Sequence, residues 1–311
     1  MKGYVLFGMV VLWDYSLPAW GFFGHRKINE TAVYTIPKPL FGFYKFHISY
    51  MAEHAADPDK RRYILESEAC KHYLDGDHYE KKIPFDTLPR WYKKAVEQYT
   101  EDSILAHGIV PWQILQVVYQ LTEAFKVKDI ERILKLSADL GHYVGDCHVP
   151  LHSTSNYNGQ KTGQRGIHAL WESRLTELYF EEYDLYTGTA EYVVNLTETV
   201  WQAFERSYSL VDSVLMLERQ VSEKYSELSK YSWEQRGNMT VKVYSKAFCE
   251  SYHEALGDMV ESRLRASALM LGALIYTAWV NAGQPVLETM PVEAPAPVVP
   301  EKAVMKGREE E

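Results

Sequence analysis

The stretch KDIERILKLSADLGHYVGDCHVPLH, residues 128–152, combines a helical pattern of apolar residues with several side chains of the kinds that bind metals. Its apolar residues recur at spacings of three and four positions, which predicts a helix over residues 128–147. His142 and Asp146 are four positions apart on that helix, so both side chains leave one face about 5–6 Å apart at Cβ. This separation suits two ligands of one metal ion.

A second pair with the same spacing follows in GIHALWESRL, residues 166–175, where His168 precedes Glu172 by four positions. Between the two pairs, Pro150 ends or kinks the first helix, and the turn after it can direct His152 toward the same pocket. Imidazole and carboxylate groups are the usual nitrogen and oxygen ligands of zinc. Two such pairs with a third histidine therefore predict a metal site, whereas a single pair would indicate a surface ion pair.

Most of the remaining sequence repeats apolar residues at helical spacing, and strand-like alternation is scarce. The expected fold class is therefore all-α, a multi-helix bundle forming one domain over residues 20–284. The clearest helices are expected over residues 112–125, 128–147, 167–179, 191–209, 211–228, 233–256 and 257–282. The last of these holds the apolar run Ala266–Val280, which is too short to span a bilayer at roughly 20 residues, so no transmembrane span is expected in the mature chain.

The two ends of the chain differ in composition from this central range. Residues 1–19 run from Lys2 through an apolar stretch to Ala19, as a secretory signal does, so we expect cleavage after Ala19 and a periplasmic or secreted protein. Residues 285–311 are rich in Pro, Val and Glu without a period, which predicts a disordered tail. The 33 basic and 42 acidic side chains give a net charge of −9, which excludes a global cationic field for long nucleic acids.

Residues further upstream complete a pattern that resembles a known superfamily. The pattern starts with Trp20 and His25 in WGFFGH, continues with Asp57 and, fifteen positions later, His72, and ends with the H-x3-D-x5-H and H-x3-E spacings described above. In this order, and over roughly residues 20–283, the chain resembles the zinc-dependent phospholipases C and the secreted single-strand-specific zinc nucleases. The resemblance implies an all-α fold that holds three zinc ions in one cleft.

The resemblance also implies which groups bind the three zinc ions. The first ion would be held by Asp57, His72, His142 and Asp146, the second by His152, His168 and Glu172, and the third by the amine and carbonyl of Trp20 together with His25, with Asp146 bridging to the first. Removal of residues 1–19 is then a condition for activity, because an acylated nitrogen on Trp20 lacks the lone pair that a metal needs.

A cluster of this kind suits the hydrolysis of phosphate esters, because zinc lowers the pKa of bound water toward ~7 and neighbouring cations neutralise the phosphoryl oxygens. The resemblance implies that Asp57 orients or deprotonates the attacking water, and a purely ligating role for Asp57 stays open. We expect an exported zinc-dependent phosphodiesterase that acts on a lipid or another small diester in the manner of a phospholipase C.

Two alternatives stay open. Glu172, where the nucleases have Asp, and the short gap between His152 and His168 resemble the phospholipases, but the tight spacing of Trp20 and His25 resembles the nucleases. A single-strand-specific nuclease or 3'-nucleotidase, which binds single-stranded nucleic acid, is therefore the first alternative. A catalytically idle metal-binding protein of the cell envelope is the second. Peripheral contact of the protein with a membrane surface stays open as well.

Overall fold

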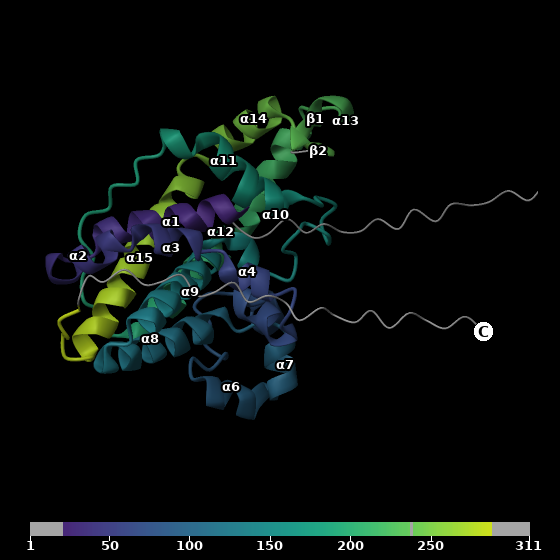
Figure 1. Ribbon diagram of the computed structural model, residues 1–311. Coiled ribbons are helices and arrows are strands. Elements are labelled where there is room, and N and C mark those ends of the chain that lie inside the picture. The colour runs from purple at the N-terminus through teal and green to yellow at the C-terminus, as the bar shows by residue number, and fades with distance from the viewer. Residues whose placement is uncertain (1–20, 237–238, 288–311) are drawn as a thin grey trace, which may run out of the picture.

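The computed structural model describes residues 21–236 and 239–287, and over these ranges the chain is a bundle of helices with one β-hairpin at its edge (Figure 1). The elements are α1 Gly21–Thr35, α2 Lys38–Phe46, α3 Ile48–Glu53, α4 Asp57–Arg61, η1 Glu66–His72, α5 Gly76–Tyr79, α6 Tyr92–Tyr99, α7 Glu101–Ala106, α8 Val110–Val127, α9 Ile130–His148, η2 Pro150–Ser153, α10 Ile167–Ala169, η3 Leu170–Arg174, α11 Leu175–Tyr179, η4 Phe180–Glu182, α12 Leu196–Ser222, α13 Glu227–Lys230, β1 Tyr231–Arg236, β2 Met239–Tyr244, α14 Lys246–Leu256 and α15 Met259–Asn281.

Helix α9 lies at the centre of the bundle. Its residues from Leu136 to His148 are buried on every face of the helix, and a helix is buried all round only when other elements surround it. Helices α1, α8, α12 and α15 pack against it (Figure 1). The C-terminal half of α9, which carries the His142 and Asp146 pair, is therefore held in a fixed position by its neighbours.

Helix α15 is the other central helix of the core. Its buried residues run from Val260 to Trp279, and it packs against α1, α8 and α9. The central core helix predicted over residues 257–282 is therefore confirmed. Within residues 21–236 and 239–287, no helix combines the length and the apolar character that crossing a membrane requires.

Helices α1 and α9 approach each other closely where Gly141 faces Asn29. The Asn29 amide donates hydrogen bonds to the carbonyls of Met51 at 2.9 Å and Ala138 at 3.2 Å, which ties α1 to α3 and α9. A Cβ atom built on Gly141 would lie 1.8 Å from Asn29 Oδ1 and 2.7 Å from Leu271 Cδ2. The close approach of the helices therefore requires glycine at position 141.

Replacing Gly141 with alanine is expected to lower the free energy of unfolding by about 1–3 kcal/mol, because the new methyl group forces buried neighbours to move. The matched control is Gly42→Ala in α2, where an added Cβ meets no atom within 4 Å. That change should leave stability unchanged or raise it by about 0.5–1 kcal/mol, because alanine favours a helix over glycine. Urea unfolding measures both variants, and equal unfolding midpoints would contradict the packing described here.

Other predicted helices agree with the structure in part. The helices expected over residues 112–125 and 128–147 are confirmed as α8 and α9. Those expected over 191–209 and 211–228 merge into the single helix α12, because no glycine or proline separates them, but α12 covers only Leu196–Ser222, so the predicted outer ends, residues 191–195 and 223–228, are not part of it. The segment 167–179 is helical throughout, but η3 within it is a π-helical turn.

The helix predicted over residues 233–256 is wrong in its first half. Residues 231–236 and 239–244 form the antiparallel strands β1 and β2, with Trp233 opposite Lys242, and only the second half is helical, as α14. The second strand reads TVKVY over residues 240–244, and its alternation of β-branched with polar residues favours a strand. The fold is nevertheless all-α in class, because the hairpin is the only sheet within the described ranges.

Candidate metal centre

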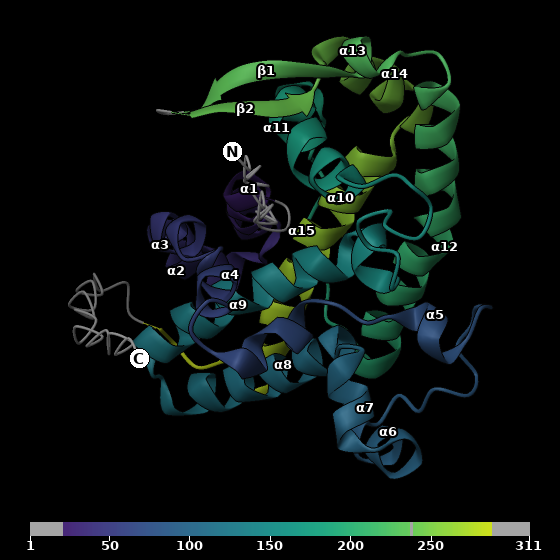
Figure 2. The ribbon, with the colours of Figure 1, turned by 90° about the vertical axis from the view of Figure 1, so that its right-hand side faces the viewer.

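Metal-binding side chains from distant parts of the sequence converge beside the C-terminal half of α9. Figure 2 shows α1, α4, α9 and α10 around this region. Helix α9 contributes His142 and Asp146. The neighbouring elements α1, α4, η1, η2, α10 and η3 contribute, in that order, His25, Asp59, His72, His152, His168 and Glu172. All of these side chains are buried except His168, which is partly exposed.

The first group of converging side chains consists of Asp59, His72, His142 and Asp146. His72 Nδ1 lies 2.9 Å from Asp146 Oδ2 and 3.8 Å from Asp59 Oδ1. His142 Nε2 lies 3.3 Å from Asp146 Oδ2, 3.7 Å from Asp59 Oδ1 and 3.0 Å from His72 Nδ1. Two imidazole nitrogens and two carboxylates therefore face one another at distances that one metal ion can bridge.

Hydrogen bonds on the far side of two histidine rings decide which nitrogen faces the carboxylates. His142 Nδ1 donates to the carbonyl of Ala55 at 3.0 Å, and His152 Nδ1 donates to the carbonyl of His72 at 2.7 Å. Because a carbonyl only accepts, Nδ1 carries the proton in each ring. Burial lowers the pKa of His142, so its ring is neutral and the lone pair on Nε2 points at the carboxylates. Such a lone pair is repelled by carboxylates unless a proton or a metal cation lies between them.

The second group consists of His152, His168 and Glu172. Glu172 Oε2 lies 2.5 Å from His168 Nε2, and Glu172 Oε1 lies 3.5 Å from His152 Nε2. Burial acts to raise the pKa of the Glu172 carboxyl, but His168 and His152 outweigh it and hold that pKa well below its usual range. The spacing of four positions brings His168 and Glu172 together as the sequence predicts, although the turn between them is partly π-helical.

His25 links the two groups. Its Nε2 lies 3.5 Å from Asp146 Oδ1, and its ring stacks on that of His142 with the centroids 3.8 Å apart. Ligand atoms of His25, Asp146 and Glu172 all lie within 4.8 Å of one another, which makes them a third candidate set. Trp20, predicted to bind the same metal as His25, lies outside the described residues.

The structure places Asp57, a predicted ligand, in none of these groups. Asp57 begins α4, where its partly exposed carboxylate accepts hydrogen bonds from His54 at 2.6 Å and from Lys60 at 2.7 Å. Asp59, two positions later, is 2% exposed and faces the first group. Residues two apart on a helix point about 200° away from each other, so only one of the two aspartates can face α9.

The electrostatics of the buried groups fit a bound metal. Burial raises the pKa of Asp59 to about 6 and that of Asp146 to about 8. The buried atoms without a hydrogen-bond partner among the described residues include several at this site, among them Asp59 Oδ2, His72 Nε2, Asp146 Oδ1 and His152 Nε2. Buried polar atoms without a partner are rare, and mixed imidazole and carboxylate donors are those of zinc sites. The residues present therefore fit the zinc ions that the sequence pattern implies.

Arg62 is a further residue at the site that sequence reasoning missed. Its Nη1 lies 3.5 Å from Asp59 Oδ1, and its side chain is 37% exposed, so the guanidinium lies at the solvent edge of the first group. Its charge also interacts with those of His72 and Asp146. In the sequence, Arg62 belongs to a short basic run after Asp59, and such a run is ordinary at an exposed helix end.

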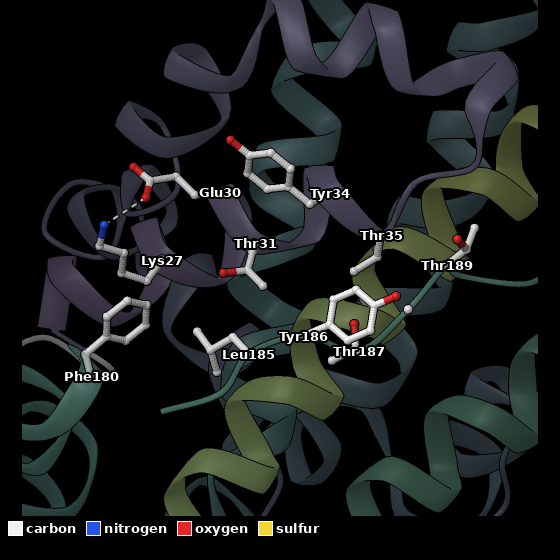
Figure 3. A pocket seen from close by; sticks show the side chains of 11 residues that line it. Lys27, Glu30, Thr31, Tyr34, Thr35, Phe180, Leu185, Tyr186, Thr187 and Thr189 are labelled. Atoms are coloured by element: carbon white, nitrogen blue, oxygen red, sulfur yellow. Dashed lines mark hydrogen bonds and ion pairs between the residues drawn. The ribbon is translucent and has the colours of Figure 1, made fainter. Parts of the chain in front are cut away.

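A separate pocket of about 590 Å³ lies between α1 and residues 180–189 (Figure 3). Lys27, Thr31 and Tyr34 line it from α1, on the face of that helix away from His25. None of the residues that line it belongs to the three groups above. Helix α1 therefore separates this pocket from the candidate metal centre.

Comparison with known proteins matches the chain to one family and to several solved structures, including two alpha toxins. The model of the family described as S1/P1 Nuclease matches residues 20–279. No curated protein matches the chain in sequence. The alpha toxin from Clostridium absonum has 12% sequence identity and a TM-score of 0.48, over 86% of this chain and 66% of the toxin. A Clostridium perfringens alpha-toxin isolated from avian strain SWCP has 13% identity and a TM-score of 0.48, over 84% of this chain and 64% of the toxin. The chain thus spans just under two thirds of the length of these toxins.

Proposed function

The chain belongs to the S1/P1 nuclease family, whose model covers residues 20–279, and from this we propose that it is a zinc-dependent phosphodiesterase. The observation that carries the proposal is the buried convergence of histidines on Asp146. The Nε2 atoms of His25, His142 and His152 lie 3.3–3.8 Å from its two carboxylate oxygens. A protein interior keeps such a set of donors together when cations bind there.

Three zinc ions would be distributed over the three groups of side chains. Their ligands would be Asp59, His72, His142 and Asp146 for the first ion, His152, His168 and Glu172 for the second, and His25 with the amine and carbonyl of Trp20 for the third, with Asp146 shared. Asp59 thereby replaces Asp57 in the set implied by the resemblance. The sharing of Asp146 is supported by the distances of both its oxygens to histidines of different groups.

Bound zinc supplies positive charge that acidifies water and neutralises the oxygens of a phosphate diester. The residues of the chain then have separate tasks. The Oδ1 atom of Asp59 faces His72 and His142. Its Oδ2 atom therefore remains to orient the attacking water and to accept its proton. Arg62, at the solvent edge, is placed to bind a phosphoryl oxygen of the substrate and to stabilise the negative charge of the transition state.

Replacing Arg62 with alanine is expected to lower kcat/KM for phosphate diesters by about 10²-fold, because a cation that stabilises transition-state charge is lost. Zinc content should stay at the parent value, since Arg62 is not a ligand. The matched control is Lys60→Ala, which removes an exposed cation two positions away whose partner is Asp57. Steady-state kinetics together with metal analysis measure both effects. An Arg62→Ala variant with the activity of the Lys60→Ala variant would rule out this role.

Two substrate classes are candidates for this site. Single-stranded nucleic acid is favoured by the family to which the chain belongs. A phospholipid is favoured by Glu172 and by the short gap between His152 and His168, both of which resemble the phospholipases C. The chemistry of the cluster is common to the two classes, because each substrate is an anionic phosphate diester.

Export belongs to the same proposal. Residues 1–19 would be removed as a secretory signal, so that Trp20 becomes the first residue of a periplasmic or secreted protein. The free amine of Trp20 could then bind metal beside His25. A chain that keeps residues 1–19 should therefore bind less zinc than the chain that begins at Trp20.

The proposal is tested on protein that begins at Trp20 and has been loaded with zinc. It is offered three substrates in parallel, each with and without a chelator: bis(p-nitrophenyl) phosphate, a phosphatidylcholine dispersion and a single-stranded oligonucleotide. We expect chelator-sensitive hydrolysis of the first and of one of the other two. Release of phosphocholine without strand cleavage would support the phospholipase activity, and strand cleavage alone would support the nuclease. Zinc binding without hydrolysis of any substrate would contradict the proposal and favour a catalytically idle protein.

A further inference from the structure

The turn that follows α4 exposes three consecutive large apolar side chains. Tyr63 is 77% exposed, Ile64 is 82% exposed and Leu65 is 47% exposed. Single apolar residues are common on protein surfaces, but contiguous apolar patches on a soluble protein mark sites of interaction. A partner that removes these three side chains from water would gain hydrophobic free energy.

The turn is preformed, so its side chains are held outward rather than folded against the protein. The amide groups of Ile64 and Leu65 donate to the carbonyl of Arg61 at 2.9 and 2.8 Å, and that of Tyr63 donates to the carbonyl of Lys60 at 3.4 Å. The backbone of the turn therefore has its hydrogen bonds within the protein. Contact with an apolar phase would bury side chains without leaving these amide groups unsatisfied.

The turn also lies directly beside the candidate metal centre. Tyr63 follows Arg62, whose guanidinium is 3.5 Å from Asp59. A second exposed aromatic residue, Tyr157, lies close to the second group of ligands, since its ring centroid is 6.0 Å from that of His168. Exposed apolar side chains therefore adjoin both groups of ligands.

The chemistry of the three side chains separates a lipid surface from single-stranded nucleic acid. Nucleic-acid bases stack on aromatic rings, and Ile64 and Leu65 have no such face to offer. Aliphatic side chains do bury in the acyl region of a bilayer, and tyrosine is suited to its polar interface. Arg62 and the exposed Lys60 lie on the N-terminal side of the turn, and although Lys60 pairs with Asp57 and Arg62 with Asp59, the exposed parts of both cations can contact lipid phosphates.

We propose that Tyr63, Ile64 and Leu65 form a membrane-contact turn that inserts into the surface of a phospholipid bilayer. The turn thereby brings the phosphodiester of a lipid headgroup to Arg62 and the metal centre. This inference rests on the proposed function and names its substrate class: the diester is presented at a lipid surface. The turn itself takes no part in the chemistry.

The test compares a double variant, Ile64→Ser with Leu65→Ser, with a matched double variant, Val194→Ser with Leu228→Ser. The control residues are 90% and 94% exposed and lie far in sequence from any ligand, before α12 and in α13. Each zinc-loaded protein is sedimented with vesicles of equal parts phosphatidylcholine and phosphatidylglycerol. Hydrolysis rates are then measured on these vesicles, on a single-stranded oligonucleotide and on soluble bis(p-nitrophenyl) phosphate.

We expect the Ile64/Leu65 variant to bind vesicles at least about tenfold more weakly than the parent, because two apolar side chains no longer enter the bilayer. For this variant, the rate of hydrolysis on vesicles divided by the rate on the soluble diester should fall by a similar factor. The Val194/Leu228 variant should keep the vesicle affinity and the rate ratio of the parent. Vesicle binding equal to that of the parent would overturn the proposal. So would an equal loss of vesicle and oligonucleotide hydrolysis, which would make the turn a nucleic-acid contact.

Failure of the proposed function gives a different result. In that case, none of the proteins hydrolyses the soluble diester in a chelator-sensitive manner, yet the loss of vesicle binding in the Ile64/Leu65 variant is still measured. Intact hydrolysis of the soluble diester with unchanged vesicle binding would instead reject the membrane-contact turn alone.

Discussion

Replacing Asp146 with asparagine is expected to abolish the hydrolysis of phosphate diesters and to lower zinc content. Asp146 Oδ2 lies 2.9 Å from His72 and 3.3 Å from His142, while Oδ1 lies 3.5 Å from His25 and 3.8 Å from His152. One carboxylate thus lies beside histidines of all three groups of ligands. The neutral amide of an asparagine at this position would bind metal more weakly and through fewer atoms. We expect kcat/KM to fall by at least about 10³-fold, since the charges that stabilise the transition state are lost together.

The control for this variant is Asp139→Asn, which makes the same change two turns earlier in α9. Asp139 is also buried, but it pairs with Arg61 at 3.0 Å and belongs to none of the ligand groups. Its substitution should lower stability while leaving zinc content at the parent value. Metal analysis and kinetics on both variants separate the two roles. Equal zinc content in Asp146→Asn and the parent would show that Asp146 is not a ligand.

Asp59→Asn is expected to have the second largest effect, with a loss of at least about 10²-fold in kcat/KM. Asp59 is buried beside His72 and His142, and its Oδ2 has no hydrogen-bond partner among the described residues. If zinc content falls together with the rate, Asp59 acts mainly as a ligand. If the rate falls while zinc remains bound, Asp59 acts mainly on the attacking water.

Asp57→Asn is the matched control, because the same change is made two positions away on the same short helix. Asp57 is partly exposed and paired with His54 and Lys60, so its substitution should leave zinc content and kcat/KM within about twofold of the parent, as is usual for exposed ion pairs. The reverse outcome, with Asp57→Asn inactive and Asp59→Asn active, would show that Asp57 is the functional aspartate, as the sequence predicts. It would contradict the role that we infer for Asp59 from its position in the first group.

The sequence predicted the parts of the site that depend on spacing within one helical segment. His142 with Asp146, and His168 with Glu172, are each separated by four positions, and the helical backbone alone brings such pairs together. The choice between Asp57 and Asp59 depends instead on how the five-residue helix α4 is rotated against α9. That rotation is set by tertiary packing, which the local pattern does not contain.

Local sequence patterns did not predict two further features of the structure, for the same reason. The strands β1 and β2 lie in a stretch with apolar residues that also fit helical spacing, so the helix predicted there was wrong over its first half. The exposure of Ile64 and Leu65 depends on how the other described elements pack around α4. In the sequence, these residues are indistinguishable from residues of the core.

We propose that the buried cluster beside α9 binds zinc. The most direct measurement is an anomalous difference map at the zinc edge, from crystals of the zinc-loaded protein that begins at Trp20. We expect three peaks, one among Asp59, His72, His142 and Asp146, one among His152, His168 and Glu172, and one beside His25. A map with no peak within this cluster would show that these side chains do not bind zinc.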